Sequence, residues 1–155
     1  MMRRLITLIL TIVAYCGVAE AQSLRLQERL PDVDVDSTEG SKLKSITKEY
    51  TCLVFMHSKS QPSIETIREF MEASADRLEY MAVVLITPED DMDQEQLNSI
   101  MATDAVVAFD NNNHTFESFE VHHVPFAVIY QTSSRIVKWF GALSQLDGSV
   151  LHGII

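Results

Sequence analysis

Residues 51–56, with the sequence TCLVFM, restrict the fold of this chain more than any other feature. A strand with one face in water alternates apolar and polar side chains, whereas a strand covered on both faces is apolar throughout. The run therefore predicts a strand buried on both faces of a parallel sheet. A second apolar run, at residues 80–86, predicts another strand of the same kind.

The segment between these two strands has the pattern of an amphipathic helix. After a polar loop, apolar side chains recur at spacings of three and four residues, which places them on one helical face. They are Ile64, Ile67, Phe70 and Met71. Ser60 or Ser63 is expected to cap the start of this helix, because a serine hydroxyl can accept a hydrogen bond from an unpaired backbone N–H.

The remaining segments predict the other elements of an α/β domain. Before the first strand, aspartates and valines alternate at residues 32–36, which predicts a short half-exposed strand. Gly40 and the lysines after it predict a turn and a connecting segment. After the second strand we expect a helix from Asp93, a strand at 105–109, a turn at 110–113, a helical turn at 115–120, a hairpin of strands 126–130 and 136–140 broken at Gly141, and a final short helix. This order predicts an α/β fold with a mixed sheet.

The first 21 residues have the pattern of a secretory signal peptide. Two arginines precede an apolar run at residues 5–14, and Ala19-Glu20-Ala21 follows as a cleavage site. The apolar run is too short to span a membrane, which takes about 20 residues. We therefore predict a signal peptide at residues 1–21 and one mature domain at 22–155. A retained anchor and a lipid attached at Cys16 are the alternatives.

Cleavage would leave an acidic chain with a single thiol. The full sequence carries 12 basic and 22 acidic residues, a net charge of -10, and loss of two arginines and Glu20 changes this to -11. Without a basic cluster, such a chain is a poor partner for nucleic acid or for an anionic membrane surface. Cys52 would be the only cysteine of the mature domain.

Several short motifs, in this order, resemble the thioredoxin-like superfamily, and in particular its exported TlpA/ResA-like redoxin branch. They are LPD at residues 30–32, LVF at 53–55, SQPS at 60–63, VP at 124–125 before the strand at 126–130, and GAL at 141–143. The resemblance implies a thioredoxin-like fold, with a central mixed sheet flanked by helices. It also implies a cis-proline loop at Val124-Pro125.

The resemblance also marks a departure from the family's redox chemistry. Family members carry Cys-x-x-Cys where this chain has Ser60-Gln61-Pro62-Ser63. Their catalysis needs a thiolate that attacks a disulfide and a second thiol that resolves it. Val54 stands where relatives often place a buried polar or acidic side chain, and Lys59 where an aromatic residue usually precedes the first cysteine.

These observations predict an exported, non-catalytic module that binds a protein or peptide partner in the periplasm or cell envelope of a bacterium, or a secreted protein in another kind of organism. Val124 and Pro125 would form a peptide groove beside the degenerate motif at residues 60–63, and no catalytic residue, metal or cofactor is assigned. A redoxin-type thiol–disulfide oxidoreductase using Cys52 is one alternative.

The histidines supply two further alternatives. If the resemblance holds, His57 and the pair His122-His123 would lie near one another and near the two serines. Imidazoles suit copper or zinc, so a metal-binding protein is the first of these alternatives. A Ser/His hydrolase is the second, although the sequence shows no orienting acid and no oxyanion hole.

Overall fold

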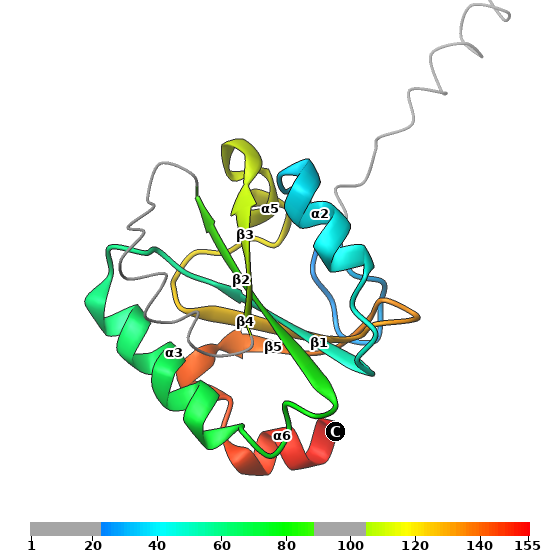
Figure 1. Ribbon diagram of the computed structural model, residues 1–155, viewed down its shortest axis with the longest axis vertical. Coiled ribbons are helices and arrows are strands. Elements are labelled where there is room, and N and C mark those ends of the chain that lie inside the picture. Colours follow the sequence, from blue (N-terminus) through cyan, green and yellow to red (C-terminus); the bar gives the residue numbers. More distant parts are fainter. Residues whose placement is uncertain (1–22, 89–104) are drawn as a thin grey trace, which may run out of the picture.

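The computed structural model describes residues 23–88 and 105–155, which form a five-stranded sheet with the order β3-β2-β1-β4-β5 (Figure 1). The strands are β1 (Tyr50–Phe55), β2 (Met81–Pro88), β3 (Ala105–Asp110), β4 (Phe126–Gln131) and β5 (Ile136–Ala142). β2 is parallel to β1 and to β3, while β4 is antiparallel to β1 and β5. The sheet is therefore mixed, as predicted, and residues 51–55 of the predicted strand lie in its central strand, β1.

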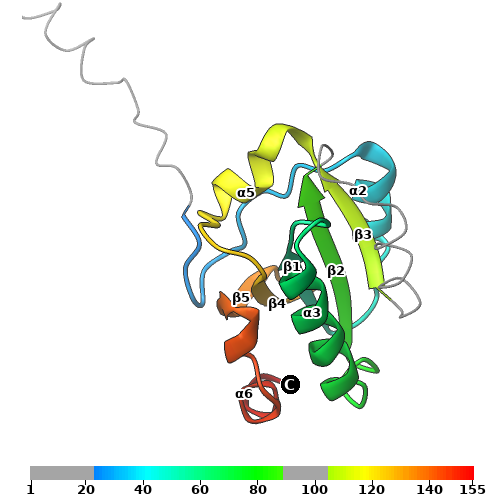
Figure 2. The ribbon, with the colours of Figure 1, turned by 90° about the vertical axis from the view of Figure 1, so that its left-hand side faces the viewer.

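Helices cover both faces of this sheet (Figure 2). They are α2 (Ser37–Lys44), α3 (Gln61–Ala73), α5 (His114–Ser118) and α6 (Gly148–Ile154), with short 3-10 turns at Asn111–Asn113 and Leu143–Gln145. Side chains of β1 alternate between two apolar clusters, with Cys52 and Val54 on the α3 and α6 side and Leu53 and Phe55 on the other. Across the described ranges, no helix has the length and apolar character needed to span a membrane.

Helix α2 corrects the prediction of a turn and connecting segment after residue 36. Its sequence, STEGSKLK, has no apolar stripe and contains Gly40, so local pattern gives little sign of a helix. The Gly40 N–H donates to the Asp36 carbonyl at 2.7 Å, which is a local bond of the first helical turn. The tertiary support comes from Leu43, which packs against the core. The strand predicted at 32–36 is reduced to an isolated bridge between Val35 and Asp110.

Strand β5 also differs from its prediction, because it passes through Gly141 and ends at Ala142. Gly141 pairs with Ala127 of β4, so the ladder continues there. A Cβ atom at this position would meet the Trp139 ring at 3.2 Å. The glycine therefore makes room for an aromatic ring rather than ending the strand. The helix predicted from Asp93 lies outside the described residues.

Residues 27–36, which we call the N-terminal strap, cross one face of the sheet from one edge strand to the other. At β5, the Gln27 N–H donates to the Val137 carbonyl at 2.9 Å, and the Leu30 N–H donates to the Arg135 carbonyl at 2.7 Å. At β3, the Asp36 N–H donates to the Phe109 carbonyl at 3.2 Å. The strap is blue to light blue in Figure 2, and the side chain of its residue Leu30 is buried in the core.

Glycine in place of Glu120 is expected to stabilise the fold. The Val121 N–H donates to the Phe116 carbonyl and the Glu120 N–H to the Glu117 carbonyl, both at 3.0 Å, which closes α5 with Glu120 at a φ of 52°. Because this left-handed conformation disfavours a Cβ atom, Glu120→Gly should raise the free energy of unfolding by about 0.5–1 kcal/mol in urea denaturation. Glu117→Gly, inside the helix, should lower it by a similar amount. If the two variants changed the free energy of unfolding equally and in the same direction, this explanation would be wrong.

Candidate functional site

Ser60 and Ser63 lie together where the chain leaves β1 and enters α3. The Ser60 N–H donates to the His57 carbonyl at 3.0 Å, and the Ser60 carbonyl accepts from the Ile64 N–H at 3.1 Å. Ser60 thus occupies the N-cap position, as one of the two predicted caps. Its hydroxyl makes no capping hydrogen bond to the backbone, and accepts instead from the Ser63 hydroxyl at 3.0 Å.

The four residues of this motif differ in exposure. Ser63 is only 1 % exposed, whereas Ser60 is partly exposed and Gln61 and Pro62 face solvent. Pro62 stands in the first turn of α3, where its missing N–H removes no helical hydrogen bond. A partner molecule can therefore reach Ser60 and the exposed first turn, with Ser63 beneath them.

A second loop reaches the same end of the sheet. Phe126, the first residue of β4, pairs with Phe55, the last residue of β1. The loop before β4 and the loop after β1 therefore lie at one end, on the left of Figure 1. The Val124–Pro125 peptide bond is cis, and the Pro125 carbonyl accepts from the Leu143 N–H at 3.0 Å. Within residues 23–88 and 105–155, the backbone of Val124 enters no hydrogen bond.

A group of phenylalanine rings supports both loops. The Phe55 ring lies 5.1 Å from those of Phe116 and Phe119 and 6.3 Å from that of Phe126, measured between centroids. Phe116 is held in turn by Asp110, a carboxylate only 1 % exposed that accepts from the N–H groups of Thr115 at 2.9 Å and Phe116 at 3.0 Å. Sequence reasoning missed this support, since Asp110 had only the pattern of a turn residue.

The three histidines near this end of the molecule are exposed. His57 stacks on the Phe116 ring at 5.7 Å, and His123 meets the edge of the Phe126 ring at 5.5 Å. In the part of the chain that the structure describes, no three His, Cys, Asp or Glu side chains gather so that they could hold a metal ion. The two contacts pack His57 and His123 against the phenylalanine group, and His122 is exposed beside them.

Cys52 lies in the middle of β1, between Val83 of β2 and Ile129 of β4, and has no exposed surface. Burial raises the pKa of its thiol to about 12, because a thiolate there would lose its hydration. Nucleophilic attack by cysteine needs the thiolate, so the folded chain holds this thiol in an unreactive form.

Cys52 is therefore expected to resist a small thiol reagent such as iodoacetamide in the native protein at pH 8 and to react fully in urea. The expected difference in rate is at least about 100-fold, since both access and thiolate fraction are lost on folding. Mass spectrometry after timed quenching measures it. A Ser134→Cys variant, with the new thiol in the exposed β4–β5 loop, serves as the positive control. Fast native labelling at Cys52 would revive the redoxin-type alternative.

The fold resembles those of several solved proteins, although the sequence matches no protein-family model and no curated protein. One is a thioredoxin-like protein from Aeropyrum pernix, with 16 % identity, 72 % of this chain and 81 % of that chain covered and a TM-score of 0.59. Another is a thioredoxin-like protein in the oxidized form, with 16 % identity, 85 % and 100 % covered and a TM-score of 0.63. A third is a secreted disulfide oxidoreductase from Mycobacterium tuberculosis, with 14 % identity, 67 % and 81 % covered and a TM-score of 0.51.

The predicted fold class is thus confirmed, because this chain has the α/β architecture of thioredoxin-like proteins. The similar structures include thiol–disulfide oxidoreductases, which carry out chemistry that needs reactive thiols. At 16 % identity or less, the likeness is one of fold.

Proposed function

Because this chain has a thioredoxin-like fold, we propose that it binds a protein or peptide partner without carrying out redox chemistry. The observation that carries the proposal is the Ser63–Ser60 hydroxyl pair, 3.0 Å apart at the start of α3. We take these serines to stand where the dithiol motif stands in the oxidoreductases of the TlpA/ResA-like branch. The pair keeps the spacing and the place of that motif but contains no sulfur.

The chemistry of serine supports the loss of redox activity. A hydroxyl has a far higher pKa than a thiol and forms no disulfide, so Ser60 can neither attack a disulfide nor be resolved by Ser63. Cys52 lies buried within β1, away from the helix start, and its thiol stays protonated. The described residues therefore offer no reactive thiol at this end of the sheet.

The loop at Val124 supports a binding role. Its backbone N–H and carbonyl have no hydrogen-bonding partner among the described residues, which suits an extended peptide that pairs with them as an added strand. The Ser60 hydroxyl and the exposed first turn of α3 would form a neutral polar wall beside this peptide. No metal or cofactor is required.

Export is a further part of the proposal. The signal peptide at residues 1–21 and Cys16 lie outside the described residues, so the sequence pattern alone supports it. After cleavage, the partner would be met in the periplasm or cell envelope of a bacterium, or outside another type of cell. The mature protein should then begin at Gln22, and N-terminal sequencing of the exported product that finds residue 1 instead would contradict export by cleavage.

Peptides selected from a random 12-residue phage library against the mature protein are expected to bind at Val124. Binding should protect the Val124 amide from hydrogen exchange by at least about tenfold, because its N–H would gain a partner. A Ser60→Trp variant, which fills the proposed groove, should bind the same synthetic peptides at least about tenfold more weakly, a loss of about 1.4 kcal/mol.

The matched control is Ser134→Trp, in the exposed loop at the opposite end of the sheet. It should leave peptide affinity unchanged. Peptides that protect amides elsewhere and bind both variants equally well would overturn the assignment of the groove.

A further inference from the structure

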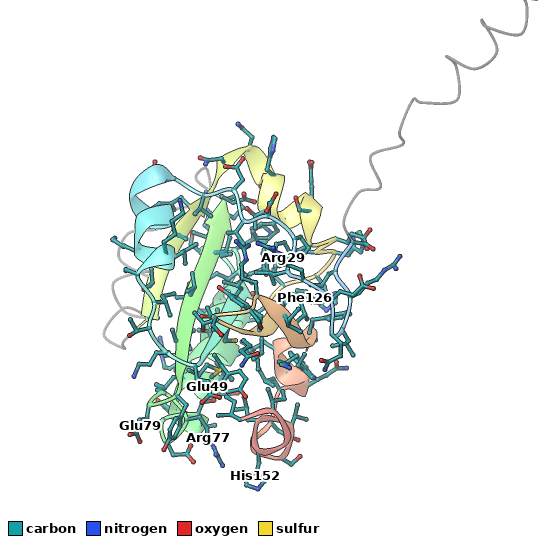
Figure 3. All side chains as sticks on the ribbon, turned by 90° about the vertical axis from the view of Figure 1, so that its right-hand side faces the viewer. Arg29, Glu49, Arg77, Glu79, Phe126 and His152 are labelled. Carbon is teal, nitrogen blue, oxygen red and sulfur yellow. The ribbon has the colours of Figure 1, made fainter. Side chains whose placement is uncertain are left out.

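A hollow of about 960 Å³ lies between α2 and the end of β4. It is lined on one side by residues of α2 and the segment that follows, and on the other by residues at the β4–β5 turn. Tyr50, where β1 begins, pairs with Gln131, where β4 ends, so this hollow is at the opposite end of the sheet from Ser60. Figure 3 views the molecule from this end, with Glu49 labelled.

The inner lining of the hollow is apolar. Val35 and Tyr130 belong to the buried cluster on this face of the sheet, and Leu43 and Ile46 pack against it while they remain partly exposed. Ligand sites in proteins are commonly hollows of roughly 300–1,000 Å³ with an apolar lining and a few polar groups that fix orientation. The hollow fits this description in size, and its lining combines these apolar side chains with polar and charged ones.

The charged side chains that line the hollow are mostly positive, whereas the whole chain is negative. Three cations line it, Lys44, Lys48 and Arg135, against the single carboxylate of Glu49, although the chain carries a net charge of -10. A local excess of positive charge on an acidic protein favours an anionic ligand.

Two of these cations are held in place by backbone carbonyls. The Lys48 ammonium donates to the Glu79 carbonyl at 2.9 Å. The Arg135 guanidinium donates through one Nη to the Pro31 carbonyl at 3.3 Å. A guanidinium has five donors, so the remaining N–H groups of Arg135 can serve a carboxylate as a fork.

Tyr130, which also lines the hollow, carries a neutral phenol hydroxyl. Burial raises the pKa of its phenol, and a hydrogen bond with Thr51 and the positive charge of Arg135 oppose that rise. The hollow thus combines apolar side chains with Tyr130 and Arg135, which both lie on its β4–β5 side.

We infer that this hollow binds an aliphatic carboxylate, with its hydrocarbon chain on the floor of Val35, Leu43 and Ile46 and its head group between Arg135 and Lys44. The apolar lining favours a hydrocarbon body over a sugar or a nucleotide. The excess of cations favours a carboxylate over an amine or an alcohol. This site is separate from the groove at Ser60 and does not depend on the function proposed there.

Decanoate, used below the concentration at which it forms micelles, is the probe for this site in isothermal titration calorimetry of the full mature chain. We expect one bound decanoate per chain. Decanol and decyltrimethylammonium should bind at least tenfold more weakly, since neither offers a carboxylate. Absence of decanoate binding, or equal binding of decanol, would overturn the inference.

Variants separate a built site from general attraction by charge. Lys44→Gln/Arg135→Gln should weaken decanoate binding at least tenfold. The control Arg68→Gln/Lys138→Gln removes the same two residue types outside the lining of the hollow and should bind as the natural chain does. Equal loss in both double variants would overturn the inference.

A third variant, Ile46→Trp, fills the hollow from a partly exposed position and should abolish binding without lowering the thermal midpoint. If it binds decanoate normally, the hollow is not the site. Ser60→Trp should also bind decanoate normally, so this inference and the proposed peptide groove stand or fall separately.

Discussion

A Ser60→Cys/Ser63→Cys variant is expected to catalyse the reduction of insulin by dithiothreitol, whereas the natural chain is expected to show only the uncatalysed rate. The two hydroxyls are hydrogen-bonded at 3.0 Å, so thiols at these positions would lie within reach of each other. A thiol at the start of α3 would also have a lowered pKa, because the helix N-terminus favours the thiolate. The rate of insulin turbidity should rise by at least about tenfold, which corresponds to about 1.4 kcal/mol of barrier.

The controls separate this dithiol from the natural cysteine. The single variant Ser60→Cys should be inactive in turnover, because no second thiol resolves the mixed disulfide. Cys52→Ala in the double-variant background should retain the gained activity. Insulin reduction by the natural chain would refute the redox-inactive assignment, and an inactive but folded double variant would show that residues 60–63 do not have dithiol geometry.

Phe55→Ala is expected to cause the largest loss of stability. The Phe55 side chain is fully buried at the end of β1 and contacts the rings of Phe116, Phe119 and Phe126. Replacing a buried phenylalanine with alanine costs about 3–5 kcal/mol, from lost transfer free energy and from the cavity left behind. The free energy of unfolding of a typical domain is only about 5–15 kcal/mol, so this loss would be a large part of it. The midpoint of urea denaturation measures it.

Two further variants test the reason for this loss. Phe55→Leu keeps most of the apolar volume and should lose roughly half as much or less. Tyr80→Ala removes a ring that is 47 % exposed and should change the free energy of unfolding by less than about 1 kcal/mol. If Phe55→Ala is no more destabilising than Tyr80→Ala, the phenylalanine group does not support this end of the sheet.

The sheet and the main helix were predictable because their apolar patterns are strong. Residues 52–56 are apolar without a break, and residues 52–55 lie in the central strand with both faces covered. The spacing of Ile64, Ile67 and Phe70 likewise gives the buried face of α3. In both cases burial of apolar area decides the structure, and burial leaves a visible pattern in the sequence.

Other features depend on contacts between segments far apart in the chain. Helix α2 has no apolar stripe, and it forms because Leu43 finds a core built by later strands. The hollow beneath it is bounded by Leu43 and Arg135, which lie more than 90 residues apart in sequence. Helix geometry brings the hydroxyls of Ser60 and Ser63 close together. It does not determine that the Ser60 hydroxyl bonds the Ser63 hydroxyl rather than a backbone N–H of α3. Local patterns carry no information about such choices.

The N-terminal strap has a consequence for self-association. It is synthesised first, but one of its partners, Val137, comes more than 100 residues later. Until each outer strand pairs with the strap, its outward N–H and carbonyl groups can template pairing with a second molecule. Once the strap pairs with β5 and with β3, it occupies part of each outer strand from within the same chain. The segment thus limits β-sheet growth between molecules, and we expect its removal by proteolysis to expose part of both outer strands to pairing with a second molecule.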